Sequence, residues 1–180
     1  MNLYLSDRIS RIQTSQTIEI SDLARNLLSE GKKVISLSQG EPDFETPDHI
    51  KEAAIKAIKD GFTRYSNVDG MPLLKKAICK KFLNENNLEY EIPEISVGNG
   101  CKQIIFNALM SILNPGDEVI LPAPYWGSYK DMVDFAEGIP KIVNCSLTDD
   151  FKLTAKALEL AINDSTRCLI LNNPTNPSGS

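Results

Sequence analysis

The second half of the chain alternates short apolar runs with amphipathic segments of helical length, and this alternation limits the possible folds most. Strands are predicted for four apolar runs: 95–97, 118–121, 139–144 and 168–171. Helices are predicted for the segment carrying Ile104, Ile105, Ala108, Leu109 and Ile112 on one side, for a segment near 127–136 and for one around 154–162. Strands separated by such helices form parallel βαβ units with right-handed crossovers. We therefore predict an α/β fold, whose ligands gather at the carboxyl ends of the strands.

The first half of the chain is mainly helical by the same criteria. We predict a helix over 18–30 that ends at Gly31, a short strand at 34–37, and a helix that starts at Thr46-Pro47 and ends at Gly61. A further helix is predicted over about 72–86. The expected inward residues are Ile20, Leu23, Ala24, Leu27 and Leu28 in the first helix, Ile50, Ala53, Ala54, Ala57 and Ile58 in the second, and Leu73, Leu74, Ala77, Ile78, Lys81 and Phe82 in the third.

Charge and residue types exclude several classes of function. The formal net charge of -5 argues against nucleic acid or anionic lipid as the main partner, because both would be repelled. The single histidine, His49, and four cysteines without CxxC spacing do not form a zinc-binding pattern. No window approaches the roughly 18 apolar residues needed to span a bilayer, and the N-terminus lacks a signal-peptide pattern. We expect a cytoplasmic protein with reduced thiols and a small-molecule ligand.

The loop Gly98–Gln103 follows a predicted strand and leads into a helix. Its glycines allow a tight turn, and the unpaired N–H groups at the helix start suit a phosphate. A dinucleotide fingerprint is excluded because Gln103 stands where its last glycine is needed, and a Walker P-loop pattern is absent. The alternative interpretation is an ordinary turn between strand and helix.

Two other loops follow predicted strands. Pro122–Trp126 carries the only tryptophan, whose flat ring could stack on a planar cofactor or could simply plug the space between loops. Asn173–Gly179 contains two Asn-Pro steps, which restrict the backbone before each proline and would present the Asn176 amide in a fixed direction. A plain connecting loop is the alternative for this segment.

Five motifs in order resemble the fold-type-I, class I aminotransferases, and specifically the bacterial aspartate aminotransferase subgroup. The resemblance covers nearly the whole chain. The motifs are Ser38–Phe44, Arg64-Tyr65 with Gly70–Leu73, Gly100–Gln103, Pro122–Trp126 and Asn173–Gly179. It implies the N-terminal half of a fold built on a parallel-rich sheet with helices on both faces. It also implies an N-terminal arm and the start of a small domain at 1–45, and an incomplete large cofactor-binding domain at 46–180.

The resemblance implies pyridoxal 5'-phosphate (PLP) as the cofactor. In the family pattern, the backbone amides at Cys101 and Lys102 would hold the phosphate, and Trp126 would stack on the pyridine ring. Asn176 would donate a hydrogen bond to the phenolic oxygen of that ring. Tyr65 would reach the phosphate of the neighbouring subunit, because the family's sites lie across a homodimer interface.

The same resemblance implies how an amino acid substrate would be held. Trp126 and Asn176 would border it, and the Gly40 amide would contact its α-carboxylate. Lys102, together with Thr17 or Ser15, would meet the distal carboxylate of a dicarboxylic substrate. Without the resemblance, Lys102 reads as a solvated surface lysine.

The sequence also departs from the family pattern. Cys101 stands where a smaller residue is common, Gln16 where proline is usual, and Ser178 where threonine is frequent.

No lysine in residues 1–180 matches the family's Schiff-base lysine, so no catalytic residue is assigned and Lys102 is not a candidate. The sequence ends in a polar loop where a covering helix is expected, so it looks cut rather than completed. PLP chemistry needs that lysine, and we expect this polypeptide alone to be inactive.

The sequence leaves three interpretations of function. The first is the N-terminal part of an aspartate aminotransferase, which converts L-aspartate and 2-oxoglutarate to oxaloacetate and L-glutamate. The second is the same fold acting on prephenate or on other dicarboxylic or aromatic amino acids. The third is a non-catalytic remnant of a split or degraded gene, which would dock on a homologue or pair with a separately encoded half.

Overall fold

The computed structural model describes residues 4–12, 14–38, 40 and 42–180, without the side chain of Gln16. Gln39 and Glu41 of the motif at 38–44, and the side chain at the Gln16 departure, therefore lie outside the described residues. The chain divides into two compact units, which we call the sheet unit (Met1–Gln39 with Ile105–Ser180) and the helical unit (Gly40–Ile104). The domain division expected at residue 45 remains a prediction.

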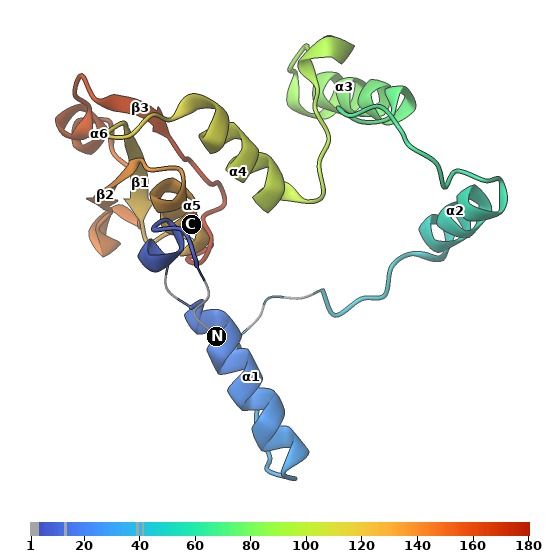
Figure 1. Ribbon diagram of the computed structural model, residues 1–180, viewed down its shortest axis with the longest axis horizontal. Coiled ribbons are helices and arrows are strands. Elements are labelled where there is room, and N and C mark those ends of the chain that lie inside the picture. Colours follow the sequence, from blue (N-terminus) through green and yellow to red (C-terminus); the bar gives the residue numbers. More distant parts are fainter. Residues whose placement is uncertain (1–3, 13, 39, 41) are drawn as a thin grey trace. The chain divides into compact units, whose positions relative to one another are not determined.

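The sheet unit is built on three parallel strands. They are β1 (Glu118–Ala123), β2 (Ile139–Asn144) and β3 (Thr166–Leu169), in the spatial order β2-β1-β3 (Figure 1). β1 pairs with β2 along its whole length, and its pairing with β3 has one irregularity between Glu118 and Val119. The predicted α/β class is thus confirmed, and β1 is the central strand.

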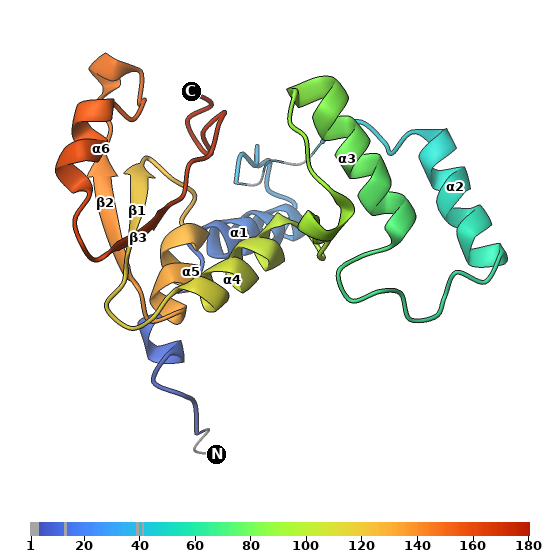
Figure 2. The ribbon, with the colours of Figure 1, turned by 90° about the horizontal axis from the view of Figure 1, so that it is seen from above.

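Helices α5 (Ser128–Phe135) and α6 (Ala155–Ala161) connect the strands and lie on opposite sides of them (Figure 2). The direction of travel explains this arrangement. The chain moves from β1 to β2 and then returns past β1 to β3, and right-handed crossovers in opposite directions place their helices on opposite faces. A strand order of this kind creates a ligand crevice at the carboxyl ends of β1 and β3, where the order reverses.

The core of the sheet unit lies between β1, α5 and the end of α4 (Cys101–Ile112). Its buried members are Leu109, Val119, Leu121, Tyr129, Met132, Val133 and Ala136. Three of them, Tyr129, Met132 and Val133, lie on one face of α5, as the amphipathic pattern of that segment predicts. The core thus fixes the two elements, β1 and α5, that flank the Trp126 loop.

The N-terminal part of the sheet unit contains a short 3-10 helix, η1 (Ile9–Arg11), and helix α1 (Gln16–Ser29). α1 ends at Ser29, one residue before the predicted 30, and Gly31 follows its C-cap as expected, with a φ of 78° in the left-handed region that glycine tolerates. Ala24 is buried, but Ile20 and Leu23 remain more than half exposed, so the predicted inward face is only partly covered. Together with 34–38, this face borders an apolar groove.

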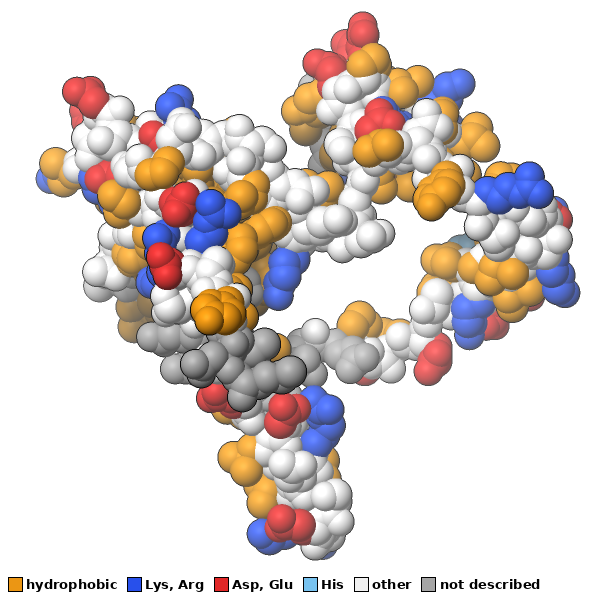
Figure 3. Space-filling view, viewed as in Figure 1, with side chains coloured by type: hydrophobic (Ala, Val, Ile, Leu, Met, Phe, Trp, Pro, Cys, Tyr) orange, Lys and Arg blue, Asp and Glu red, His pale blue; other side chains and the backbone are white. Residues whose placement is uncertain are grey.

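The helical unit contains α2 (Asp48–Lys59), α3 (Pro72–Asn86) and a short 3-10 helix, η2 (Ile92–Glu94). The bounds of α3 match the prediction, and α2 ends at Lys59, two residues before the predicted end at Gly61. The predicted inward faces are mostly uncovered: α2 has no buried residue, and the buried residue of α3 is Lys75, although Ile78 and Phe82 on the predicted face of α3 are half-buried. Apolar side chains are therefore visible on the surface of both helices (Figure 3).

Two predicted strands and one predicted helix cap are wrong. Residues 34–37 and 95–97 are extended but form no strand, because in the described parts of the chain neither segment pairs with a neighbour in a ladder. Ile35 and Leu37 are 90% and 93% exposed, so their apolar pattern is not used within this structure. The N-cap of α2 is Pro47, and the Thr46 hydroxyl does not cap the helix.

Within the described ranges, no helix is both long and apolar enough to cross a membrane.

The amino ends of the strands are joined by charged side chains. Glu118 accepts hydrogen bonds from Lys141 (2.8 Å) and from the Asn163 side chain (3.0 Å). These bonds, the one from Lys141 first, hold the pKa of Glu118 below its ordinary value. Asp117 likewise accepts from the Asn114 amide and from Arg167, and its pKa is lowered. Both carboxylates therefore stabilise the fold in their charged form.

The stabilisation by Glu118 is expected to disappear in acid. Because its folded pKa lies below the unfolded one, its contribution is complete above the unfolded pKa and is lost as pH falls through the folded pKa. Urea unfolding of wild type and Glu118→Gln should thus differ at pH 7 and converge towards pH 3. Glu159→Gln, which changes an exposed glutamate of α6, is the control. A difference between wild type and Glu118→Gln that grows in acid would contradict the assignment.

Candidate functional site

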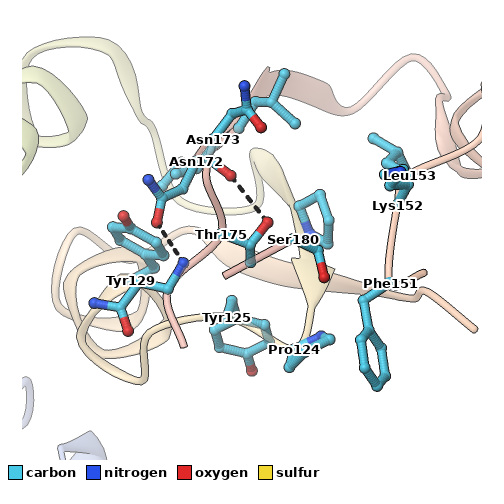
Figure 4. A pocket seen from close by; sticks show the side chains of 14 residues that line it. Pro124, Tyr125, Tyr129, Phe151, Lys152, Leu153, Asn172, Asn173, Thr175 and Ser180 are labelled. Atoms are coloured by element: carbon cyan, nitrogen blue, oxygen red, sulfur yellow. Dashed lines mark hydrogen bonds between the residues drawn. The ribbon is translucent and has the colours of Figure 1, made fainter. Parts of the chain in front are cut away.

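Two of the loops singled out from sequence emerge at the same end of the sheet. β1 ends at Ala123 and runs into the loop with Trp126, while β3 ends at Leu169 and runs into the loop with Asn176. Since β1 and β3 are parallel neighbours, their carboxyl ends lie side by side. A cavity opens there, lined by Tyr125, Tyr129, Phe151 and the segment 172–176 (Figure 4).

Asn172 organises the loop that carries Asn176. Its Oδ1 accepts a hydrogen bond from the Asn176 amide (2.9 Å), and its carbonyl accepts one from the Thr175 hydroxyl (3.1 Å; Figure 4). The Thr175 amide donates to the Ser180 carbonyl and the Gly179 amide to the Thr175 carbonyl, both at 2.7 Å. These bonds fold the loop back on itself and hold Asn176 at the cavity wall. Asn172 was not among the predicted site residues, although asparagine side chains favour such local bonds to nearby backbone groups.

Trp126 is held by an aromatic contact and borders a second cavity. Its ring meets that of Tyr129 edge to face, with 5.4 Å between centroids and an interplanar angle of 87°. The indole is half-buried against the core, so its orientation is fixed by packing. The second cavity is also lined by Ser15 and Thr17 from the N-terminal segment, and Tyr125 lines both cavities.

The N-terminal segment is attached to the sheet unit by ion pairs. Arg8, which precedes η1, and Arg11, its last residue, approach the Glu137 carboxylate to 3.5 and 3.6 Å. Exposed pairs of this kind stabilise weakly, but here two of them share one acceptor and η1 contacts α5. This attachment accounts for the position of Ser15 and Thr17 near the tryptophan loop.

The glycine loop of the helical unit leads into the first residue of α4, Cys101. Gly100 has a φ of 84°, a conformation that favours glycine, and Gly98 packs closely on Ile104, whose Cδ1 lies 2.6 Å from the position a Cβ would take. Asn99 donates its amide to the Gln103 side chain, which closes the turn. The first-turn amides of a helix have no intrahelical acceptor, and they point towards the space where an anion is favoured.

The structure places the predicted site residues in two sets. Thr17, Trp126 and Asn176 belong to the sheet unit, where they line neighbouring cavities. Gly40, Tyr65, Cys101 and Lys102 belong to the helical unit, where all four are exposed. Tyr65 in particular is fully exposed in the loop ahead of α3. The roles assigned to these residues from the resemblance remain predictions.

Two relatives cover nearly all of this chain. A probable aspartate/prephenate aminotransferase of Rickettsia conorii is 54% identical over 176 residues, which are 98% of this chain and 44% of the relative. An aspartate aminotransferase of Rhizobium meliloti is 52% identical over 175 residues, 97% of this chain and 43% of the relative. The chain thus spans less than half the length of these curated relatives.

Solved structures give the same result for the fold. The crystal structure of the Rhizobium meliloti aspartate aminotransferase matches with a TM-score of 0.93 and 50% identity, over 98% of this chain and 44% of that one. The Thermus thermophilus aspartate aminotransferase solved with maleate matches with a TM-score of 0.94 and 39% identity, over 97% and 46%. These likenesses identify the α/β architecture as part of the fold-type-I aminotransferase fold. A family model for aminotransferases of class I and II matches residues 32–180, and the chain belongs to that family.

Proposed function

We propose that the protein containing this chain is a PLP-dependent aminotransferase that moves the amino group of L-aspartate to 2-oxoglutarate. One observation carries the proposal: the tryptophan and asparagine loops lie at the carboxyl ends of neighbouring parallel strands in a chain about half identical to aspartate aminotransferases. The products would be oxaloacetate and L-glutamate. The remnant interpretation has no comparable observation in its favour.

The residues of the sheet unit suit a planar, oxygen-bearing ring. Trp126 offers an aromatic surface fixed by Tyr129, and Asn176 lines the cavity with an amide whose backbone is fixed by Asn172. In the proposed site the indole of Trp126 would stack on the pyridine ring, and the Asn176 amide would donate a hydrogen bond to its phenolic oxygen. When bound, PLP supplies the electron sink that lets a proton leave the substrate α-carbon. The protein residues then orient the ring and restrict the access of water.

The phosphate is assigned to the start of α4. The backbone amides at Cys101 and Lys102 lie in the first turn of α4, where the positive end of the helix dipole favours an anion. The Cys101 departure is compatible with this role, because the amide and not the thiol would make the contact. We further propose that residues 46–180 contribute to the large cofactor-binding domain and 1–45 to the arm and small domain.

The substrate carboxylates are assigned to Gly40, to Lys102 and to the N-terminal segment. The Gly40 amide, with nothing within 4 Å of the position a Cβ would occupy, is open to a close approach by the α-carboxylate. Lys102, with Thr17 or Ser15, is assigned to the distal carboxylate, which accounts for a preference for dicarboxylic substrates. Tyr65 is assigned to the phosphate of the neighbouring subunit of a cytoplasmic homodimer.

A second candidate substrate is prephenate. The relatives from Rickettsia conorii and Cereibacter sphaeroides are named aspartate/prephenate aminotransferases, at 54% and 52% identity. Prephenate carries two carboxylates, so the residues proposed for aspartate suit it as well. An assay with both substrates separates the two activities.

A chimera tests the proposed function. The matching part of the Rhizobium meliloti aspartate aminotransferase would be replaced by this chain, and transamination would be measured with aspartate, prephenate and phenylalanine. We expect activity with aspartate. Lys102→Met should lower kcat/KM for aspartate by roughly 10- to 100-fold, since a charge-assisted hydrogen bond contributes about 1.5–3 kcal/mol. The value for phenylalanine, which has no distal carboxylate, should change far less.

Lys156→Met is the matched control, because it removes an exposed lysine from α6. It should leave all three substrates unaffected. A folded chimera that binds PLP but transaminates none of the substrates would refute the proposed function. An equal loss for aspartate and phenylalanine in Lys102→Met would refute the assignment of that lysine only.

A further inference from the structure

The lysine at position 75 is buried in a place that ordinarily disfavours it. Lys75 lies in the first turns of α3 and is only 4% exposed. A positive charge near a helix N-terminus is opposed by the helix dipole, and a buried charge is costly unless it is paired. Lys75 is paired: its ammonium group contacts the Asp69 carboxylate, from the loop just ahead of α3. The hydrogen bond from Lys75 holds the pKa of Asp69 below its ordinary value, so the partner stays charged.

The main chain of Asp69 is in turn attached to the segment before α4. Its carbonyl oxygen accepts a hydrogen bond from the Val97 amide at 3.0 Å. The next residue, Gly70, packs directly on Val97: a Cβ at Gly70 would lie 2.8 Å from Val97 Cβ and Cγ2. Asp69 and Gly70 therefore hold Val97 through both its backbone and its side chain.

Val97 is the first residue of the turn that ends in α4. The Asn99 amide donates to the Gln103 side chain, and the Gly100 amide donates to the Gly98 carbonyl at 2.9 Å. Gly98 packs against Ile104. Contacts thus connect Lys75 to Asp69 and Asp69 to Val97. From Val97 the chain continues directly into Gly98 and Asn99, which contact Gln103 and Ile104 of α4, all within the helical unit.

We infer that Lys75 and Asp69 form a positioning pair that fixes the turn Val97–Gly100, and with it the first-turn amides of α4, in the orientation needed to bind a phosphate group. The phosphate part of this inference rests on the proposed function. Neither side chain touches the cofactor in this assignment. They act through the backbone of the turn.

Amide hydrogen exchange of the chain, followed by NMR, tests the pair directly. In Lys75→Met, the amides of Val97, Asn99 and Gly100 should exchange at least about tenfold faster than in wild type, because local opening becomes easier. Lys76→Met, which removes the neighbouring exposed lysine, should exchange like wild type. Lys75→Arg should keep most of the protection, because it restores the cation.

Ligand binding to the same variants tests the consequence. The quantity measured is the ratio of the affinity for PLP to the affinity for pyridoxal, which lacks the phosphate. This ratio should be about tenfold lower in Lys75→Met than in wild type, equivalent to about 1.4 kcal/mol. It should be unchanged in Lys76→Met. A merely structural role would lower the affinity for both ligands and leave their ratio unchanged.

The outcomes are distinguishable from failure of the proposed function. If wild type does not prefer PLP to pyridoxal, the proposed phosphate site fails, and the exchange data alone decide whether the pair fixes the turn. The inference is overturned if Lys75→Met exchanges like Lys76→Met, or if Lys75→Arg exchanges as fast as Lys75→Met. It is also overturned if, in Lys75→Met, the exchange of the α3 amides becomes faster by as much as that of the turn amides. The same holds if the turn amides exchange faster but the variant keeps the wild-type preference for PLP over pyridoxal.

Discussion

Leu121→Ala is expected to lower the free energy of unfolding of the sheet unit by roughly 2–5 kcal/mol, the usual cost of a cavity left by a deleted core leucine. Leu121 is fully buried in the central strand and packs in the main core cluster. Trp126 is the only tryptophan and packs against that cluster, so its fluorescence during urea unfolding reports on this unit alone.

The matched control is Leu160→Ala, in α6 of the same unit. Leu160 is 78% exposed, so its truncation should change stability by no more than about 0.5 kcal/mol. If both variants unfolded at the same urea concentration as wild type, β1 would not be the centre of the folded core. The assignment of the crevice beside β1 would then lose its basis.

Gly70→Ala is expected to cost the helical unit roughly 2–6 kcal/mol. Two effects add: about 1–3 kcal/mol for a side chain at a φ of 109° and about 1–3 kcal/mol for crowding against Val97. The collision is with the Cβ of a β-branched residue, which cannot rotate away. Hydrogen exchange of the α3 amides measures the loss.

Gly61→Ala separates the two effects. Gly61 has a similar backbone conformation, with a φ of 84°, but nothing lies within 4 Å of the position a Cβ would take. Its substitution should therefore cost only the backbone term, about 1–2 kcal/mol. Equal losses in the two variants would show that Gly70 is not in close contact with Val97.

The sequence predicted those elements whose partners are close along the chain. β1, β2 and α5 form a unit of adjacent segments, and their apolar pattern finds its covering surface within a few tens of residues. The same is true of helix ends, where Gly31 and Gly61 act on their own helices. Local chemistry and short-range packing agree at these positions, which is why the pattern was sufficient.

The errors occur where an apolar pattern lacks a partner in the structure. A run such as Val34–Leu37 has the composition of a strand, but a strand exists only when another strand accepts its hydrogen bonds. Residues 95–97 show the same limit, since Val97 makes its hydrogen bond to a loop carbonyl instead of a ladder. Periodicity predicts which side chains prefer burial, and it does not say whether a surface is available.

In the candidate site, the loops of Trp126 and Asn176 could be predicted from the sequence, but the residues that position such loops could not. Parallel alternation predicted that the loops of Trp126 and Asn176 follow the carboxyl ends of strands, and the structure shows in addition that these two strands are neighbours. The supporting roles of Asn172 and Lys75 could not be predicted. The hydrogen bond to Asn172 forms only once the loop has folded back on itself. A lysine in an amphipathic helix is predicted to be exposed, and its burial is explained only by the ion pair with Asp69 that the structure shows.

Helix α2 shows what this limit means for folding. It has twelve residues, none of them buried, and Ile50, Ile55 and Ile58 are at least half exposed. An isolated helix of this length is marginal in water, because the cost of its first turn is hardly recovered by the hydrogen bonds that follow. Acquiring helical shape and acquiring a neighbour are therefore a single cooperative event for this segment, and any surface that covers the isoleucines also supplies the helix with most of its order.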